Sequence, residues 1–224
     1  MASIDYIQLY KLQDRVLSAV FAIETEFYLT GGTCLSRFYH EKRYSDDLDF
    51  FTQNSPRFSF AIKNIKKALE KEFSLDVEVE TKQFVRLRID DLLQIDFVND
   101  ISARYKDVIV TENNYLIDNV ENILSNKLTA VIGRDNPKDI FDIYLICNFY
   151  SFSWEAILNS AYEKASFSNE DLIIRLKSFP PELLSSIKCI DYDFLDNFDR
   201  EFDEIIEEII QVVDHLAIRT GKKQ

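Results

Sequence analysis

The sequence predicts an α+β fold, in which a small mixed β-sheet with helices on it precedes a helical C-terminal part. Strand-like runs are confined to the first half of the chain, and the last of them ends near residue 98. From residue 120 onward, apolar residues recur at helical spacing instead. This change of pattern places a boundary near residue 115. We therefore expect domains at 1–115 and 116–224, although no Pro/Gly-rich linker separates them.

The first domain is predicted to begin with a helix over 5–24, where apolar residues follow helical spacing. A short β-type run at 27–30 stops at Gly31-Gly32, and a helix over 33–41 follows directly. Residues 47–51 alternate polar and apolar, as a strand buried on one face does. The remaining predicted elements are a helix over 58–72 and strands over 74–81, 84–90 and 92–98, with a hairpin turn at Asp90-Asp91.

The second domain is predicted to be helical. Its first helix covers 120–134 and ends at Gly133-Arg134. A turn follows at Asp135-Asn136-Pro137, where the proline is placed to begin the next helix, which continues to about residue 149. From residue 153 onward we predict only helices.

Composition indicates a soluble globular protein, with 46% apolar and 29% charged residues. No apolar run approaches the roughly 20 residues that span a bilayer. The N-terminus lacks the basic start and apolar core of a secretory signal. Cys34, Cys147 and Cys189 have no CxxC spacing and are expected to be reduced, buried thiols. We therefore expect a cytoplasmic protein that does not bind membranes.

The net charge of −13 argues against simple electrostatic coating of nucleic acid, which needs a basic surface, but it leaves room for a local basic patch. Acidity is highest at 191–208, where one arginine stands among nine carboxylates. Two interpretations of this acidic stretch stay open: the solvated face of a helix, or a docking surface for a basic partner.

Asp47 and Asp49 are two residues apart on a predicted strand, so both side chains face the same way while Leu48 and Phe50 face the core. Two such carboxylates repel each other unless a cation lies between them, and Mg²⁺ prefers oxygen ligands of this kind. A DxD pair alone is a weak signal in an acidic protein, because an exposed strand edge has the same pattern.

Two further features favour a Mg²⁺ and phosphate site. The strand, Gly31-Gly32-Thr33 and helix just upstream would let backbone N–H groups and the start of a helix approach a phosphate. Asp96 lies between Ile95 and Phe97 in another predicted strand, where a carboxylate is costly to bury without a partner. It is interpreted either as a carboxylate paired to a basic residue or as a third carboxylate facing Asp47 and Asp49.

These residues belong to a longer pattern. The segment YLTGGTCLSRFYHEKRYSDDLDFF (28–51) resembles the nucleotidyl transferase AbiEii/AbiGii toxin family, within the DNA polymerase β-like nucleotidyltransferase superfamily. The segment KLTAVIGRDNPKDIFDIYLI (127–146) is similar to the second signature of the family. The resemblance covers about residues 27–146. Gly-Gly-Thr stands where many superfamily members have Gly-Ser, which is a small departure.

The resemblance implies a mixed sheet that bears three carboxylates, a helical part that closes over the nucleotide, and transfer of a nucleoside monophosphate from an NTP. By this resemblance, Asp47, Asp49 and Asp96 are catalytic and bind Mg²⁺. The residues implied to contact the nucleotide are Gly32, Thr33, Arg43, Lys127 and Arg134. Arg43 has the alternative of balancing Asp46 and Asp47. Asp139 and Asp142 share a helix face and would orient Lys127 or Arg134.

The leading functional prediction is Mg²⁺-dependent transfer of an NMP to a hydroxyl, with RNA such as tRNA as the expected acceptor. The enzyme would be the toxin of a bacterial toxin–antitoxin pair, with a cognate antitoxin as partner. One alternative keeps the chemistry but uses a small molecule or a protein as acceptor, which the acidic charge favours modestly. Another is a non-catalytic nucleotide-binding module, and the presence of all three carboxylates counts against it. His40 and His215 stand in no recognisable triad or metal motif.

Overall fold

A computed structural model describes residues 4–219. Contacts within the described chain divide it into two compact units. The first unit contains residues 4–39, 44–102 and 107–118, and the second contains 40–43, 103–106 and 119–219. Two short segments, 40–43 and 103–106, therefore leave the first unit and belong to the second, although each is flanked in sequence by first-unit residues.

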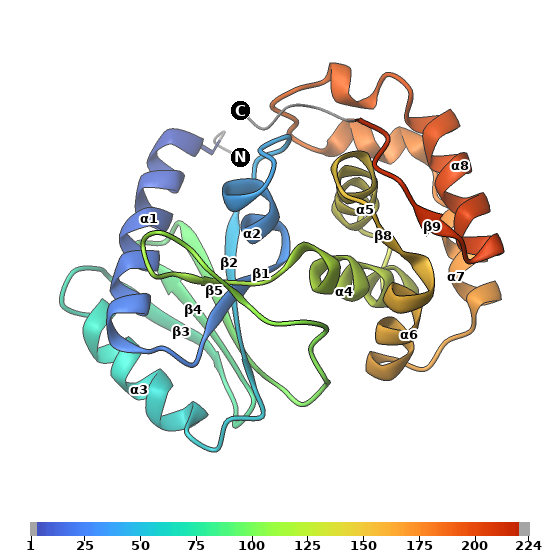
Figure 1. The fold of residues 1–224 in the computed structure, drawn as a ribbon. Coiled ribbons are helices and arrows are strands. Elements are labelled where there is room, and N and C mark those ends of the chain that lie inside the picture. The colour runs from blue at the N-terminus through green and yellow to red at the C-terminus, as the bar shows by residue number, and fades with distance from the viewer. Residues whose placement is uncertain (1–3, 220–224) are drawn as a thin grey trace. The chain divides into compact units, whose positions relative to one another are not determined.

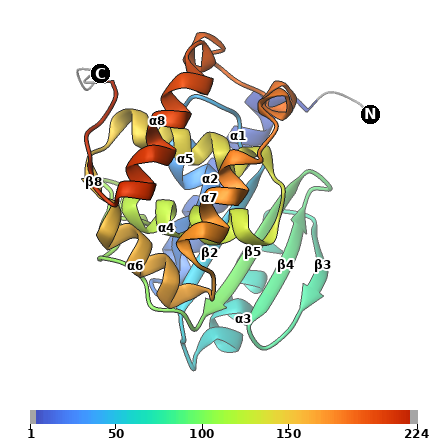
Figure 2. The same ribbon diagram turned by 90° about the vertical axis from the view of Figure 1, so that its right-hand side faces the viewer.

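The first unit is built on a mixed sheet of seven strands, in the order β3-β4-β5-β2-β1-β7-β6. Figure 2 shows β2, β5, β4 and β3 side by side. Strand β2 runs parallel to β5, and β1 runs parallel to β7, while the other neighbours are antiparallel. The strands are β1 (Tyr28–Thr30), β2 (Asp47–Gln53), β3 (Leu75–Glu80), β4 (Phe84–Ile89), β5 (Leu93–Asp100), β6 (Ile109–Val110) and β7 (Leu116–Ile117).

Helices α1 (Tyr6–Ile23) and α3 (Phe58–Leu69) pack against each other in this unit (Figure 1). Asp5 caps α1 by accepting hydrogen bonds from two backbone N–H groups of its first turn. The core of the unit is aromatic: the rings of Phe50 and Phe97 stack at 5.2 Å, and Phe27 meets both Phe97 and Phe58. The core thus fills the face of the sheet to which Leu48 and Phe50 point, and the odd-numbered residues of β2 point to the opposite face.

The predicted α+β fold is confirmed, and differences are confined to short elements. Helix α2 (Gly31–Phe38) begins at the first glycine and ends three residues before the predicted end. The two-residue strands β6 and β7 were not predicted. The hairpin turn between β4 and β5 has positive φ at Asp90 and Asp91, 50° and 55°, as a tight turn requires.

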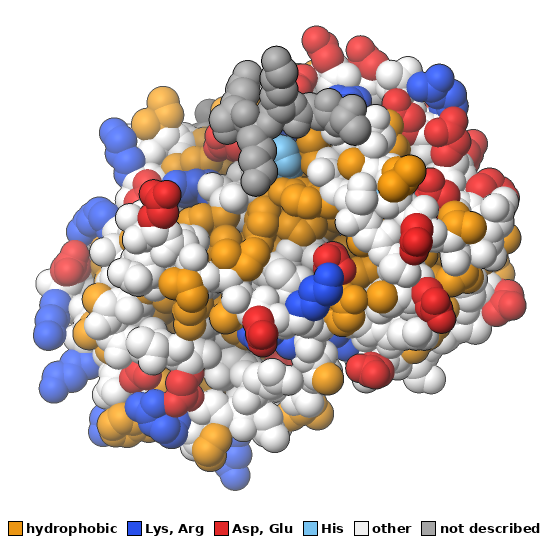
Figure 3. All heavy atoms as spheres, in the orientation of Figure 1, with side chains coloured by type: hydrophobic (Ala, Val, Ile, Leu, Met, Phe, Trp, Pro, Cys, Tyr) orange, Lys and Arg blue, Asp and Glu red, His pale blue; other side chains and the backbone are white. Residues whose placement is uncertain are grey.

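The second unit is mainly helical. Asn136 caps α5 and Pro137 occupies its first turn, so the predicted turn and proline start are confirmed. Helix α8 (Phe198–Gln211) contains most of the acidic stretch. Its Phe202, Ile205 and Ile209 are buried, while most of its acidic side chains are exposed. Figure 3 shows acidic side chains spread over the part that carries α7 and α8. The helices are α4 (Val120–Gly133), α5 (Pro137–Phe149), α6 (Trp154–Lys164), α7 (Asn169–Lys177), α8 (Phe198–Gln211) and the 3₁₀ turns η1 (Pro181–Ser186) and η2 (Asp193–Leu195).

The prediction of helices alone after residue 153 is wrong. Strand β8 (Phe152–Ser153) pairs antiparallel with β9 (Asp214–His215). Two-residue strands are too short to carry a period of two, and their pairing joins residues about sixty positions apart, so the sequence pattern holds no local signal for them. All three cysteines are buried and free, as predicted. Within residues 4–219, no helix is both long enough and apolar enough to cross a membrane.

Candidate active site

A row of polar side chains crosses the face of the sheet opposite the aromatic core of the first unit. Asp49 of β2 is in register with Asp96 of β5 and with Thr30 of β1, and Asp96 is in register with Arg86 of β4. Residues paired across strands point to the same face. The structure therefore brings two of the three predicted carboxylates to neighbouring positions on one face.

Asp47 lies in the next row of the same face, two residues along β2 and in register with Gln94. Side chains along β2 alternate in exposure: Asp47 and Asp49 are partly exposed, whereas Leu48 and Phe50 are fully buried. Packing of Leu48 and Phe50 into the core thus fixes the direction of both aspartates, because a strand turns successive side chains to opposite faces.

The glycine turn lies directly against Asp49. Gly31 has φ of +71°, and a Cβ atom at this position would lie 2.5 Å from the Asp49 Oδ2 atom. Only glycine fits both the left-handed backbone and this contact. No side chain caps α2 at Thr30. The first N–H groups of a helix have no partner within it, so the start of α2 beside Asp49 is the kind of position at which helices can bind anions.

The Thr33 side chain is fully buried, and its hydroxyl has protein partners. The hydroxyl oxygens of Thr33 and Ser45 lie 2.8 Å apart, and the Thr33 hydroxyl also bonds the main-chain carbonyl of Asp47. A contact of Thr33 with phosphate would therefore use its backbone N–H group and not its hydroxyl.

Asp96 is held by Arg86 in a two-pronged ion pair. The Arg86 Nε and Nη2 atoms donate to the two Asp96 carboxylate oxygens at 2.8 and 2.7 Å. Hydrogen bonding to Asp96, reinforced by the charges of Asp96, Glu78 and Asp47, raises the pKa of the Arg86 guanidinium against the opposing effect of burial. Of the two interpretations of Asp96 from sequence, the pairing with a basic residue is present, in a position that also faces Asp49.

The second unit contains a buried ionic cluster formed by Arg43, Lys127, Asp139 and Asp142. Arg43 donates to both oxygens of Asp142, each at 2.8 Å, and the side chains of these two residues are only 3% and 1% exposed. The Lys127 ammonium lies 2.8 Å from Asp139 and 2.7 Å from Asp142. Arg43 thus pairs with Asp142, a partner that the sequence analysis did not consider for it.

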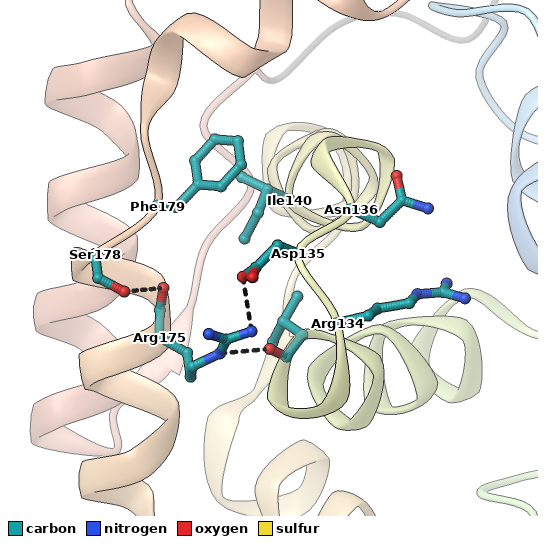
Figure 4. Close-up of a pocket in the computed structure, with 8 residues that line it drawn as sticks. Arg134, Asp135, Asn136, Ile140, Arg175, Ser178 and Phe179 are labelled. Carbon is teal, nitrogen blue, oxygen red and sulfur yellow. Dashed lines mark hydrogen bonds and ion pairs between the residues drawn. The ribbon is translucent and has the colours of Figure 1, made fainter.

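Arg134 extends this cluster to the surface. Its guanidinium donates to both oxygens of Asp139, at 2.6 and 2.9 Å, while 58% of its side chain stays exposed. Figure 4 shows that Asp135 points to Arg175, whereas Arg134 points away from both. Arg175 also donates to the Val131 carbonyl, so the turn that carries Arg134 is fixed from its other side.

The cluster combines three cations with two carboxylates, and the cation at its exposed end is Arg134. A net positive cluster of this kind suits a polyanion such as a triphosphate, and an arginine fork matches the geometry of phosphate oxygens.

The sequence model of one family, described as nucleotidyl transferase AbiEii toxin of a type IV toxin–antitoxin system, matches residues 15–219. The chain belongs to this family. The protein JHP933 of Helicobacter pylori is similar in fold, with a TM-score of 0.52 and 23% identity over 95% of this chain and 90% of that one. MenT4, a nucleotidyltransferase toxin from Mycobacterium tuberculosis, has a TM-score of 0.58 and 12% identity over 92% and 93% of the two chains. No curated protein matches the chain.

As a member of the AbiEii family, the protein is a nucleotidyltransferase. Within the described residues, no group of three or more His, Cys, Asp or Glu side chains is arranged to hold a metal ion. Asp47 and Asp49 nevertheless fit Mg²⁺, which takes one or two protein carboxylates and fills its other positions with water and substrate phosphates. Asp96 is engaged by Arg86, so it fits as a third ligand only if that ion pair rearranges.

The sequence analysis missed three residues of this AbiEii site. Gly31 was treated as a turn residue without its contact to Asp49. Arg86 was not singled out as a partner of Asp96, and Ser45 stood only within the segment that carries the family resemblance. For Arg86, the only signal was its place in a hairpin whose register decides which residue lies opposite. For Ser45, the sequence contains no local signal, because its partners come from distant helices.

Acid is expected to destabilise the helical unit of this AbiEii protein. Burial alone would raise the pKa values of Asp139 and Asp142, but Lys127 and Arg134 lower the pKa of Asp139, and Arg43 and Lys127 lower that of Asp142. Carboxylates with lowered pKa values stabilise the fold fully above their unfolded values near 4, and this contribution is lost as the pH falls through the folded values. The charges of Asp142 and Asp139 raise the pKa of Lys127 despite burial and the nearby charge of Arg43, so the contribution of Lys127 is lost only in alkali.

Urea unfolding followed by fluorescence of Trp154, the only tryptophan of the sequence and buried in α6, measures this effect. We expect the free energy of unfolding to fall steeply below about pH 4. In the Asp142→Asn variant, the free energy of unfolding should fall less steeply with acid, because one of the two low-pKa carboxylates of the buried cluster is gone. An equal slope in both proteins would contradict this assignment.

Proposed function

We propose that this AbiEii nucleotidyltransferase transfers an NMP from an NTP, bound with Mg²⁺ at Asp47 and Asp49, to a hydroxyl of RNA with release of pyrophosphate. We also propose that it acts as a toxin with a cognate antitoxin. The single observation that carries the proposal is the glycine turn against Asp49. An uncapped helix start and a metal-binding carboxylate lie side by side there, which is the arrangement that a metal-bound triphosphate requires.

Each part of the site has a separate task in this proposal. The N–H groups of Gly32 and Thr33 hold triphosphate oxygens, and Asp47 and Asp49 hold the cation. Asp96 accepts the proton of the attacking hydroxyl or serves as a further ligand, and Arg86 fixes its orientation. A bound divalent cation supplies neutralisation of the charge that develops on the transferred phosphoryl group.

The second unit contributes Arg134, whose guanidinium is held by Asp139 and directed to the surface. We propose that Arg134 contacts the nucleotide, and that buried Lys127, Asp139 and Asp142 hold it in position together with Arg43. The functional division at residue 115, with a nucleotidyltransferase core before it and a helical C-terminal domain after it, belongs to the same proposal.

Membership of a nucleotidyltransferase toxin family supports the toxin role, and RNA is the acceptor that the resemblance in the sequence favours. The net charge of −13 favours the alternative of a small molecule or protein acceptor. In the first unit, the exposed lysines Lys63 and Lys67 on α3, and Lys71 just after it, are basic groups that an RNA could use. The acceptor is therefore decided by the experiment and not by the charge of the chain.

The test incubates the purified full chain with Mg²⁺ and each α-³²P-labelled NTP, with total tRNA or without RNA. The matched control is Asp49→Asn, which keeps the shape of the side chain and removes its charge. We expect label in RNA with the wild-type chain and a loss of at least about 100-fold in the control, because charge stabilisation of phosphoryl transfer depends on the cation at this position.

Label on the protein itself would favour protein modification. Label on a small molecule present in a cell extract, with none in RNA, would favour the small-molecule alternative. Binding of NTP without transfer to any acceptor would overturn the proposed reaction. Equal labelling by Asp49→Asn and the wild-type chain would show that the reaction does not use this site.

A further inference from the structure

Ser45 is the centre of a buried hydrogen-bond network just before the strand that carries Asp47 and Asp49. Its backbone N–H donates to the Tyr10 hydroxyl at 3.2 Å, and its carbonyl accepts from the Gln13 amide at 3.0 Å. Its hydroxyl lies 2.8 Å from that of Thr33. Each polar group of Ser45 thus has a partner from α1 or α2, and the residue is only 2% exposed.

The proton of each hydroxyl can be assigned. Thr33 has one hydroxyl proton, and the Asp47 carbonyl can only accept, so Thr33 donates to that carbonyl and accepts from Ser45. The two hydroxyls therefore form a directed chain from Ser45 through Thr33 to the backbone of Asp47. Thr33 is also the third residue of α2, whose first N–H groups form the predicted phosphate site.

The outer end of the network is equally fixed. Gln13 is fully buried, and its side-chain oxygen accepts from Arg37 Nη1 at 2.9 Å, so its amide group has one orientation. Arg37 lies over the Tyr10 ring at 4.3 Å. A buried polar network with every member bonded holds a single geometry, because any rearrangement would leave a polar group unpaired.

We propose that Thr33 and Ser45, held by Gln13 and Tyr10, are positioning residues that fix the first metal-binding carboxylate, Asp47, relative to the phosphate-binding glycine turn. This inference rests on the proposed function. It assigns the Thr33 hydroxyl to the orientation of the metal site, while the backbone N–H of the same residue serves the phosphate. Groups that orient metal ligands typically change metal affinity by 10- to 100-fold when they are removed.

The test compares Thr33→Val and Ser45→Ala, which remove a hydroxyl, with the conservative variant Thr33→Ser. The control is Thr52→Val. It removes a buried hydroxyl from β2, the strand that carries Asp47, at a position facing the core. Mn²⁺ binding is measured by electron paramagnetic resonance in the presence of a non-hydrolysable NTP analogue, so no turnover is needed. Urea unfolding of every variant separates loss of folding from loss of metal binding.

We expect Thr33→Val and Ser45→Ala to weaken Mn²⁺ binding by about 10-fold and to lower kcat, with little change in KM for NTP. Thr33→Ser and Thr52→Val should bind Mn²⁺ as the wild-type chain does. Unchanged Mn²⁺ affinity in Thr33→Val would overturn the inference. A raised KM with unchanged kcat would also overturn it, because the hydroxyl would then contact the nucleotide.

The same measurements distinguish failure of the proposed function from failure of the positioning role of Thr33 and Ser45. If the wild-type chain binds no Mn²⁺, or if Asp49→Asn binds it equally well, the metal site itself is wrong, and both proposals are overturned. If Asp49→Asn alone loses Mn²⁺ and the hydroxyl variants do not, the metal site stands and only the positioning role is rejected.

Discussion

Replacing Gly31 with alanine is expected to lower the rate of nucleotidyl transfer by about 100-fold or more. The new Cβ atom would lie 2.5 Å from Asp49 Oδ2, where ordinary contacts begin near 3.4 Å, so the carboxylate or the turn must move by about 1 Å. A displacement of that size at a reacting centre costs roughly 100-fold in rate. The φ of +71° adds about 1–2 kcal/mol of backbone strain for a residue with a side chain.

The matched control is Gly133→Ala. Gly133 is the last residue of α4, and no atom lies within 4 Å of a Cβ placed there. Alanine in a helix is more favourable than glycine by roughly 0.5–1 kcal/mol, so this variant should be equally active and slightly more stable. Transfer assays at saturating NTP, together with urea unfolding, measure both effects. Wild-type activity in Gly31→Ala would contradict the close approach of the glycine turn to Asp49.

The long elements of the fold were predictable because their signals are local. Helix α1 has its Asp5 cap and helical spacing, and α5 has the Asn136 cap followed by Pro137. The direction of Asp47 and Asp49 was predictable for the same reason, since Leu48 and Phe50 between and beside them must enter the core. Local chemistry therefore fixed which face of the strand carries the carboxylates.

The pairing partner of Asp96 was missed, because it depends on the hairpin register, and the predicted turn was one residue too short. Ile89 pairs with Leu93, so three residues lie between the strands and Arg86 falls opposite Asp96. A two-residue loop at Asp90-Asp91 would instead pair Ile89 with Leu92 and place Val85 opposite Asp96. Such a shift would put Val85 and Asp96 on one face, whereas the observed register pairs the apolar residues of the two strands with each other. The alternation of apolar residues therefore favours the observed register, and it was the assumed two-residue turn that concealed the Arg86–Asp96 pair.

The sequence also gave no signal for contacts between distant segments. Arg43 stands four residues before Asp47, which favoured a role near the DxD pair, but its side chain binds Asp142 in the second unit. The Thr33 hydroxyl looked available for phosphate because it follows the glycine turn, but it is bonded within the first unit. Both cases depend on tertiary packing that no periodic pattern records.

The Asp142→Asn substitution is expected to destabilise the helical unit by about 3–5 kcal/mol, the usual cost of removing one partner from a buried ion pair. It would leave the Arg43 guanidinium and the Lys127 ammonium close together, with Asp139 as the one remaining carboxylate of the cluster. Unfolding in urea followed by Trp154 fluorescence reports on this unit, because Trp154 is buried in α6.

Two comparisons show whether the unpaired charge causes the loss of stability in Asp142→Asn. Glu207→Gln breaks an ion pair with Lys177 whose side chains are both more than half exposed, at 3.4 Å, and should change stability little. The double variant Arg43→Leu with Asp142→Leu removes both charges of the pair and should be more stable than the additive sum of its single variants, because no buried charge is left unpaired by the change. Additive losses would mean that packing, and not charge pairing, accounts for the stability of the cluster. In that case the cluster would no longer be a reason to regard Arg134 as rigidly held. Asp139 orients Arg134, and Asp139 is itself held in place by its ion pair with Lys127.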